Sequence, residues 1–170
     1  WKKEILYMLF KKTYEYLEIE KSKSQEAKSE DDIFRLKEFL EQKERLPAST
    51  SEIVTDFASQ ILPKSYLSYN TFRRIFQHFT NIDAMKKLKL ISPVIESEKE
   101  PSFFTMTVYA KDYRFILSDI TGVVSSEGLN LIGMRSFKTK DDYAINQIQF
   151  TDSFGSGNIS TEKIERLKSN

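Results

Sequence analysis

The chain contains few side chains whose type and spacing suit covalent or metal chemistry. Its only histidine is His78, and it has no cysteine. One histidine cannot build a site of several histidine ligands, so we interpret His78 as a packing or helix-surface residue. The adjacent acids Asp141 and Asp142 are better explained as part of a turn than as a catalytic pair. We therefore expect no catalytic site and no metal site in this chain.

The stretch from Ala110 to Leu131, AKDYRFILSDITGVVSSEGLNL, could instead bind a small ligand. An extended segment reaches Asp112, a helical pattern follows, and a second extended segment begins after Gly128. Backbone N–H groups at the start of the helix, near Phe115 and Ile116, could receive a carboxylate, because helix N-termini favour anions. Asp112 could cap the helix, accept the ammonium group of a ligand, or do both.

Two further candidates lie where the chain returns to an extended segment. Asn130 could make a strand-edge hydrogen bond or contact a ligand, and Leu131 follows it. The candidate ligand-binding set is therefore Asp112, Phe115, Ile116, Asn130 and Leu131.

The first half of the chain must supply helices to support this stretch. Apolar residues recur at helical spacing in four segments, which cover residues 1–17, 33–46, 49–62 and 70–88. The polar residues 18–32 between the first two segments predict a loop or a linker. Ser49 and Glu52 have the spacing of a capping box. The apolar side of the last helix is predicted to consist of Phe72, Ile75, Phe76 and Phe79.

After Lys89 the apolar period changes to that of strands. The pattern predicts strands over residues 90–96, 102–110, 129–137 and 143–152, a loop over 153–158 and a helix over 160–169. Phe104, Met106, Val108 and Ala110 should share one face, because strand side chains alternate. Gly128 suits the left-handed position that ends a helix. Ser160 is a predicted cap for the last helix, whose core side is Ile164 and Leu167.

From residue 102 onward the predicted order is βαββα, which lacks one strand of the common βαββαβ unit. That unit makes a four-stranded antiparallel sheet with two helices on one face. Without the last strand, one edge of the first strand would be unpaired. We expect another copy of the chain, or residues such as Leu90–Glu96, to cover it.

Composition limits the classes of function. The 170 residues are 39% hydrophobic and 30% charged, as in globular proteins, and carry a formal net charge of +1. Near-neutral charge argues against a nucleic-acid binder. The sequence contains neither an apolar run long enough for a membrane helix nor a signal-peptide pattern. Because the chain starts at Trp1, we expect an internal fragment of a longer, cytoplasmic protein.

The second half resembles an ACT domain, a small ferredoxin-like module that senses amino acids. More narrowly, the chain resembles the helical linker and first ACT repeat of bacterial protein-PII uridylyltransferases, which also remove the uridylyl group. VYAKD (108–112), SSEGLNL (125–131) and MRSFKTKDDYAINQIQFTD (134–152) carry this resemblance. The matching family positions are Gly128, Asn130, Arg135, Phe137, Thr139 and Asp141. Segments 1–17, 62–67 and the pair His78–Phe79 are similar to the family's helical lead-in.

The resemblance implies an α+β chain with a helical lead-in over residues 1–89 and an ACT-like regulatory domain over 90–170. It implies glutamine as effector, the PII signalling protein as partner of the parent enzyme, and homodimers formed through ACT domains. The parent would be a nucleotidyltransferase whose catalytic motifs this chain lacks.

Three positions depart from the family pattern. Phe115 stands where many ACT domains have glycine, Asp142 replaces a turn glycine, and Asn146 replaces an aspartate. Glycine allows a close backbone approach to a ligand, whereas the ring of Phe115 would fill that space. The alternative is therefore a non-sensing module for dimerisation or docking.

Overall fold

The computed structural model describes residues 30–63, 65–90, 93–99, 103–152 and 159–169. The helix predicted over 1–17, nearly all of the polar linker and the loop predicted over 153–158 lie outside these ranges. The chain forms two compact units, Trp1–Ser59 with Lys64–Ile75, and Gln60–Pro63 with Phe76–Asn170. The sequence instead suggested a boundary near residue 89, which stays a prediction.

The first unit is helical. It contains a helix over residues 30–42, α2 (Ala48–Ser59), α3 (Tyr66–Tyr69) and the first residues of α4 (Phe72–Leu88). The rings of Phe39 and Phe72 pack with centroids 5.8 Å apart. An ion pair of 3.0 Å joins Lys37 to Glu52. The buried apolar residues of this helical unit are Leu36, Leu40, Val54, Ala58, Tyr66, Leu67 and Ile75.

The start of α2 differs from the prediction. The helix begins at Ala48, so Ser49 lies in its first turn and cannot be the cap of a capping box with Glu52. The carbonyl of Pro47 accepts the N–H groups of Thr50 and Ser51, at 2.9 and 3.0 Å. The fixed φ of proline suits a position beside a helix start, which explains the earlier beginning.

Helix α4 forms where the sequence predicted it, but of the four residues predicted for its apolar side only Ile75 is buried. The buried residues are Ile75, His78, Ile82 and Met85. These positions recur every three to four residues and so share one face of the helix. Phe72, Phe76 and Phe79 are only partly buried. The prediction missed the rest of the buried stripe because it used only the first half of the helix, where the phenylalanines are.

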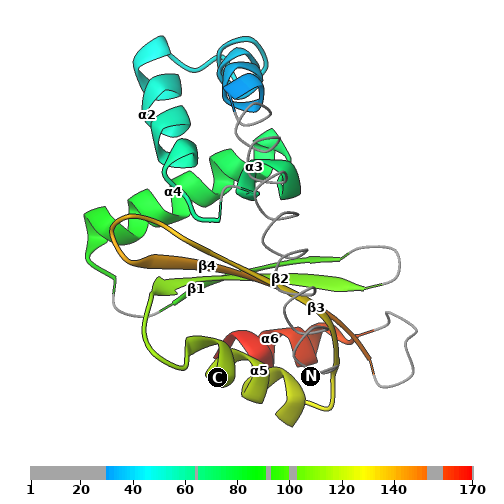
Figure 1. Ribbon diagram of the computed structural model, residues 1–170. Coiled ribbons are helices and arrows are strands. Elements are labelled where there is room, and N and C mark those ends of the chain that lie inside the picture. The colour runs from blue at the N-terminus through cyan, green and yellow to red at the C-terminus, as the bar shows by residue number, and fades with distance from the viewer. Residues whose placement is uncertain (1–29, 64, 91–92, 100–102, 153–158, 170) are drawn as a thin grey trace, which may run out of the picture. The chain divides into compact units, whose positions relative to one another are not determined.

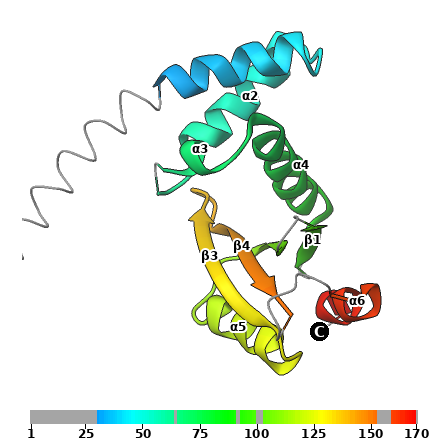
Figure 2. The same cartoon turned by 90° about the vertical axis from the view of Figure 1, so that its right-hand side faces the viewer.

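The second unit contains one four-stranded antiparallel sheet of order β1-β2-β4-β3, which confirms a mixed α+β structure (Figure 1). Its strands are β1 (Val94–Lys99), β2 (Phe104–Lys111), β3 (Asn130–Lys138) and β4 (Tyr143–Thr151). Helix α5 (Ile116–Ser126) connects β2 to β3, and α6 (Thr161–Ser169) follows β4. The two helices lie on one side of the sheet, and α4 lies on the other (Figures 1 and 2).

Strand β1 covers the edge of β2 that the sequence left unpaired. It pairs antiparallel with β2, from Val94 opposite Tyr109 to Lys99 opposite Phe104. The prediction that residues from Leu90–Glu96 cover this edge is confirmed for Val94–Glu96. The described chain order is thus ββαββα, and the sheet has four strands without a strand after α6.

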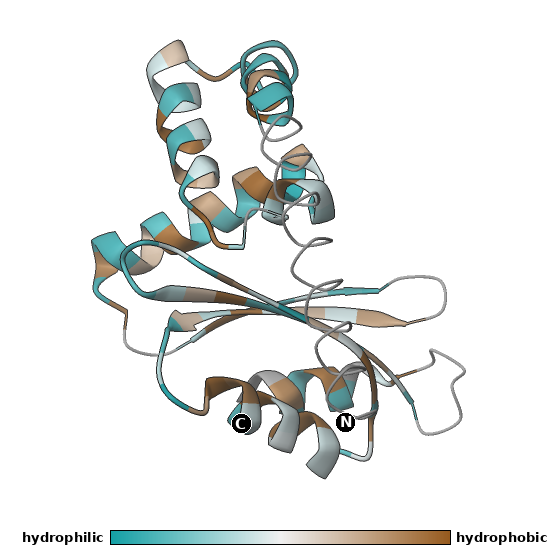
Figure 3. Ribbon diagram, viewed as in Figure 1, coloured by the Kyte–Doolittle hydropathy of each residue, from teal (hydrophilic) through white to brown (hydrophobic). Residues whose placement is uncertain are grey.

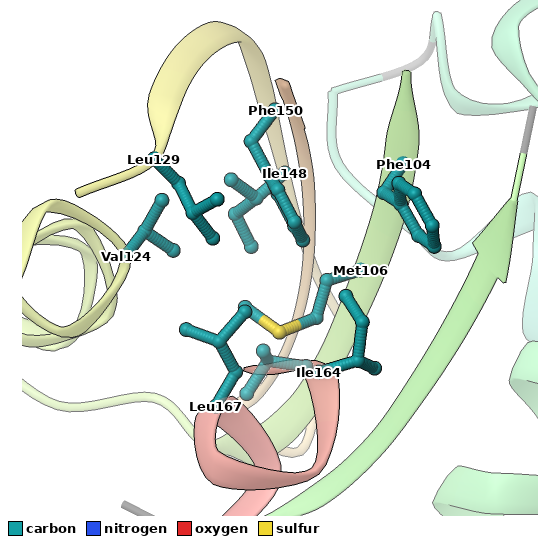
Figure 4. Packing of buried hydrophobic residues seen from close by; sticks show 9 residues of the cluster. Phe104, Met106, Val124, Leu129, Ile148, Phe150, Ile164 and Leu167 are labelled. Carbon is teal, nitrogen blue, oxygen red and sulfur yellow. The ribbon is translucent and has the colours of Figure 1, made fainter. Parts of the chain in front are cut away.

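The α5/α6 face of the sheet is apolar, as the alternation in β2 predicted. Phe104 and Phe150 stack with centroids 6.2 Å apart, and Met106, Val108 and Ile148 continue the layer. Val124 and Leu129 pack on it from α5 and the residues after it, and Ile164 and Leu167 from α6 (Figure 4). The predicted helix ends also form. Gly128 has φ +64°, and Ser160 Oγ accepts the N–H of Lys163 at 3.4 Å.

The α4 face is held by polar contacts as well as by burial. Tyr109 Oη donates to Glu96 Oε2 at 2.7 Å, and Gln77 Nε2 of α4 donates to Glu96 Oε1 at 2.9 Å. The buried ring of His78 meets Tyr109 edge-on, with centroids 5.7 Å apart. His78 is therefore a packing residue, one of the two roles that the sequence allowed.

Candidate functional site

The five candidate ligand-binding residues lie at two places. Asp112, Phe115 and Ile116 are together between β2 and α5. Asn130 and Leu131 begin β3, whose other end, Lys138, pairs with Ala144. Asn130 pairs with Thr151 of β4, seven residues beyond Ala144, which is about 24 Å along the strand. The described structure does not bring the two groups together within this chain.

Phe115 is the N-cap of α5 and has a left-handed backbone, with φ 77° and ψ 3°. Left-handed conformations suit glycine and cost other residues free energy. The side chain is 65% exposed, so burial of the ring does not compensate for this strain. The predicted cap, Asp112, is wrong, because the helix starts at Ile116, its N-cap is Phe115, and no side chain caps it.

Asp112 is instead part of an ion-pair cluster. Lys138 Nζ lies 2.8 Å from Asp112 Oδ2 and 2.9 Å from Asp142 Oδ1. Hydrogen bonds to these carboxylates, that to Asp112 first, hold the pKa of Lys138 above its usual value. The hydrogen bond with Lys138 also lowers the pKa of Asp142. A ligand's ammonium group at Asp112 would have to compete with Lys138.

The side chains of the β2–α5 loop contact their own neighbours. Tyr113 Oη donates to Asp119 Oδ2 at 2.8 Å, and this bond raises the pKa of Tyr113. The guanidinium of Arg114 lies 4.9 Å from the ring centroid of Phe115. Besides the exposed guanidinium of Arg114, backbone N–H groups are the donors that a ligand could reach.

Two such donors exist at the start of α5. The N–H of Ile116 bonds Tyr113 O at 3.2 Å, and that of Asp119 bonds Phe115 O at 3.0 Å. Among the described residues, the N–H groups of Leu117 and Ser118 between them have no acceptor. Ile116 itself is buried against Ala110 and Ala144, so its side chain serves packing. A carboxylate could bind at these free N–H groups.

The turn between β3 and β4 is contacted by residues that the sequence analysis did not select. Lys86 of α4 pairs with the Asp141 carboxylate, and Lys111 Nζ donates to Asp141 O at 2.8 Å. The same two lysines lie 5.7 and 4.3 Å from the ring centroid of Tyr143. The density of charged residues in Lys138–Asp142 was a visible signal, but Lys86 and Lys111 lie far away in sequence.

Strand β3 is an edge strand with exposed apolar side chains. Leu131, Ile132 and Met134 are exposed, and the register shifts between Leu131 and Gly133. Asn130 Nδ2 donates to Asp152 O at 3.4 Å, which supports the strand-edge role suggested for it. At the other end of the edge, Lys138 and Leu62 exchange two backbone hydrogen bonds of 2.8 and 2.9 Å.

One buried polar group interrupts the α5/α6 face. Asn146 is fully buried on β4, where its Oδ1 accepts a hydrogen bond of 2.7 Å from Ser136 Oγ. Its Nδ2 has no hydrogen-bond partner among the described residues. A buried amide donor without a partner costs free energy, so a water molecule is the simplest group to satisfy it.

Comparisons with known proteins do not assign the chain to a class. No protein-family model matches it, and no curated protein matches its sequence. In the described ranges, no group of three or more acidic or histidine side chains could hold a metal ion. No helix among the described residues is both long and apolar enough to cross a membrane.

Proposed function

We propose that this chain is a regulatory fragment of a protein-PII uridylyltransferase, with an ACT-like domain that senses or relays glutamine status. Its partner would be the PII signalling protein, through catalytic domains outside this chain. The fragment itself would not be an enzyme and would need no cofactor.

The arrangement of the sheet supports this proposal. In a ferredoxin-like βαββαβ unit, the first strand lies between the third and the last. Here β2, β3 and β4 would be the first three strands, and β1 occupies the place of the last. The two helices of such a unit lie on one face, as α5 and α6 do.

The observation that carries the proposal is the backbone at two positions where the ACT family has glycine. Phe115 has φ 77° and Asp142 has φ 59°, although neither is glycine. Few non-glycine residues have positive φ, and for a bulky aromatic residue it is an outlier. A positive φ at these two positions is the backbone conformation that a glycine would favour, and this supports the proposal.

Calorimetric titration of the whole chain with glutamine tests the proposal. We expect saturable binding that alanine and aspartate do not give. Asp112→Asn should weaken this binding, because it removes the charge that would hold the ammonium group. Asp83→Asn is the matched control, since the Asp83 carboxylate is also paired with a lysine, Lys87, but within α4. Absence of binding by the folded chain would contradict a sensing role.

A second candidate function, a dimerisation or docking module, is favoured by the open edge of β3. Lys138 directs its backbone groups outward to Leu62, so those of Ser136 and Met134 also point outward. Among the described residues these groups have no partner. The opposite edge, β1, carries the charged residues Glu96, Glu98 and Lys99, which discourage strand pairing.

Sedimentation velocity over a range of concentrations distinguishes this second function. We expect a dimer that Ile132→Lys dissociates, because the lysine places a charge at the pairing edge. Phe34→Lys is the control, since Phe34 is equally exposed but lies in the helical unit. A chain that is monomeric at every concentration would contradict edge pairing.

A further inference from the structure

Three segments that are distant in sequence meet at the turn between β3 and β4, residues 139–142. Lys86 reaches it from α4, and Lys111 and Asp112 reach it from the end of β2. Leu62 pairs with Lys138, the residue just before the turn. The turn is mostly hydrophilic (Figure 3), and an ion pair joins it to the end of α4.

The turn itself has a defined conformation. Asp142 N–H bonds Thr139 O at 3.3 Å, and Thr139 N–H bonds Tyr143 O at 2.9 Å. Thr139 is buried, and its Oγ1 accepts the N–H of Tyr143 at 3.1 Å. These bonds fix the backbone of the turn that carries the neighbouring residues Asp141 and Asp142.

We propose that this turn couples the β2–α5 loop to α4: a change in the partner of the Asp112 carboxylate alters how firmly the last turn of α4 is held. On one side, Asp112 shares Lys138 with Asp142, and its N–H donates to Asp142 O at 2.7 Å. On the other side, Asp141 holds Lys86. The two consecutive acids thus connect the loop to the helix.

The coupling has a direction that follows from charge. A cationic group that binds Asp112 displaces the Lys138 ammonium, which then has Asp142 as its remaining acidic partner. The turn loses one of its two connections to the loop, and the Asp141–Lys86 pair shifts with it. Coupling between two sites is reciprocal, so loss of the Lys86 pair must equally change binding of the cation at Asp112.

Amide hydrogen exchange of the full chain tests the coupling without any ligand. Asp112→Asn removes the carboxylate charge at nearly constant size, as a bound cation would neutralise it. We expect it to speed exchange of the amides of residues 85–88 by about two- to thirtyfold, the range of measured couplings. Lys138→Met removes the lysine that pairs with both Asp112 and Asp142, so it should speed exchange of the same amides.

Two helix variants complete the experiment. Lys86→Met should speed the same amides, and adding Asp112→Asn to it should produce no further change. Lys87→Met is the control, because Lys87 pairs with Asp83 at 2.7 Å within α4 and does not contact the turn. Unchanged exchange in both Asp112→Asn and Lys138→Met would overturn the coupling, as would additive effects of Asp112→Asn and Lys86→Met.

The inference rests on the proposed function only for the nature of the ligand. Failure of glutamine to bind would contradict sensing but would leave the exchange results unchanged. Conversely, glutamine binding without any change in amide exchange of residues 85–88 would support the sensing function and contradict the coupling through the turn.

Discussion

The two faces of the sheet differ, although the same strands supply both. The α5/α6 face is a layer of aliphatic and aromatic side chains around Phe104, Ile148 and Phe150. The α4 face joins its helix through hydrogen bonds to Glu96 and through the edge-on contact of His78 with Tyr109. Apolar burial has no preferred direction, whereas hydrogen bonds fix geometry. The comparison teaches that one face is held by apolar burial, whereas the other adds oriented hydrogen bonds that position a helix.

The largest predicted effect is on the α5/α6 face. Phe150→Ala should lower the free energy of unfolding by about 3–5 kcal/mol, because it deletes a fully buried ring and leaves a cavity. Urea denaturation measures the change. Phe150→Leu should lower the free energy of unfolding by much less. This second variant can be measured even if the alanine variant does not fold. A loss below about 1 kcal/mol for the alanine variant would remove the contrast between the faces.

On the α4 face, Tyr109→Phe should cost about 1 kcal/mol. The variant keeps the buried ring but removes the donor to Glu96 Oε2, which water can partly replace because Glu96 is half-buried. The α4 amides should exchange faster than the loss of global stability alone would explain. Tyr113→Phe is the control, since its hydroxyl bond to Asp119 is exposed. An equal loss in both variants would contradict a positioning role for Tyr109.

The third prediction concerns the entry to α5. Phe115→Gly should raise the free energy of unfolding by about 0.5–1 kcal/mol, because glycine adopts φ 77° without strain. Phe115→Ala removes the same ring but keeps the Cβ atom, so it should produce no such gain. Thermal unfolding of the two variants separates strain from loss of the ring. If the glycine variant is the less stable one, Phe115 is not strained.

The smallest effect is on titration at the turn. The hydrogen bond with Lys86 lowers the pKa of Asp141. A lowered folded-state pKa contributes stability above the unfolded pKa, and this contribution is lost as pH falls through the folded value. Carboxyl NMR titration below about pH 4 should show Lys86→Met raising the pKa of Asp141. Lys87→Met should leave it unchanged, and an unchanged pKa in Lys86→Met would contradict the ion pair.

Much of the fold follows from local patterns. Alternation placed Phe104, Met106, Val108 and Ala110 on one face of β2, and their packing in the apolar clusters on the α5/α6 side confirms it. Spacing also predicted α6 with Ile164 and Leu167 inward. The sequence predicted that the edge of β2 needs a partner strand, but it left open whether another copy or residues such as Leu90–Glu96 supply that strand. Pairing between segments depends on the whole sheet, which local periodicity does not contain.

The candidate site was less predictable for the same reason. Asp112 has the right type and position for a cap, but an ion pair with Lys138, 26 residues later, fixes its side chain. Lys86 and Asp141 are 55 residues apart and carry no local signal of their contact. Phe115 was recognised as a departure from a glycine position, whereas its left-handed backbone required the structure.

The position of β1 in the chain also has a kinetic consequence. Lys99 and Phe104, which pair, are five residues apart, whereas a strand placed after α6 would close a loop of at least 58 residues from Lys111 to Ser169. The longer loop would cost about 2 kcal/mol more in closure entropy. Local pairing lowers the contact order, and chains with low contact order fold faster. The hairpin of β1 and β2 can therefore form early and offer β4 an edge on which to add.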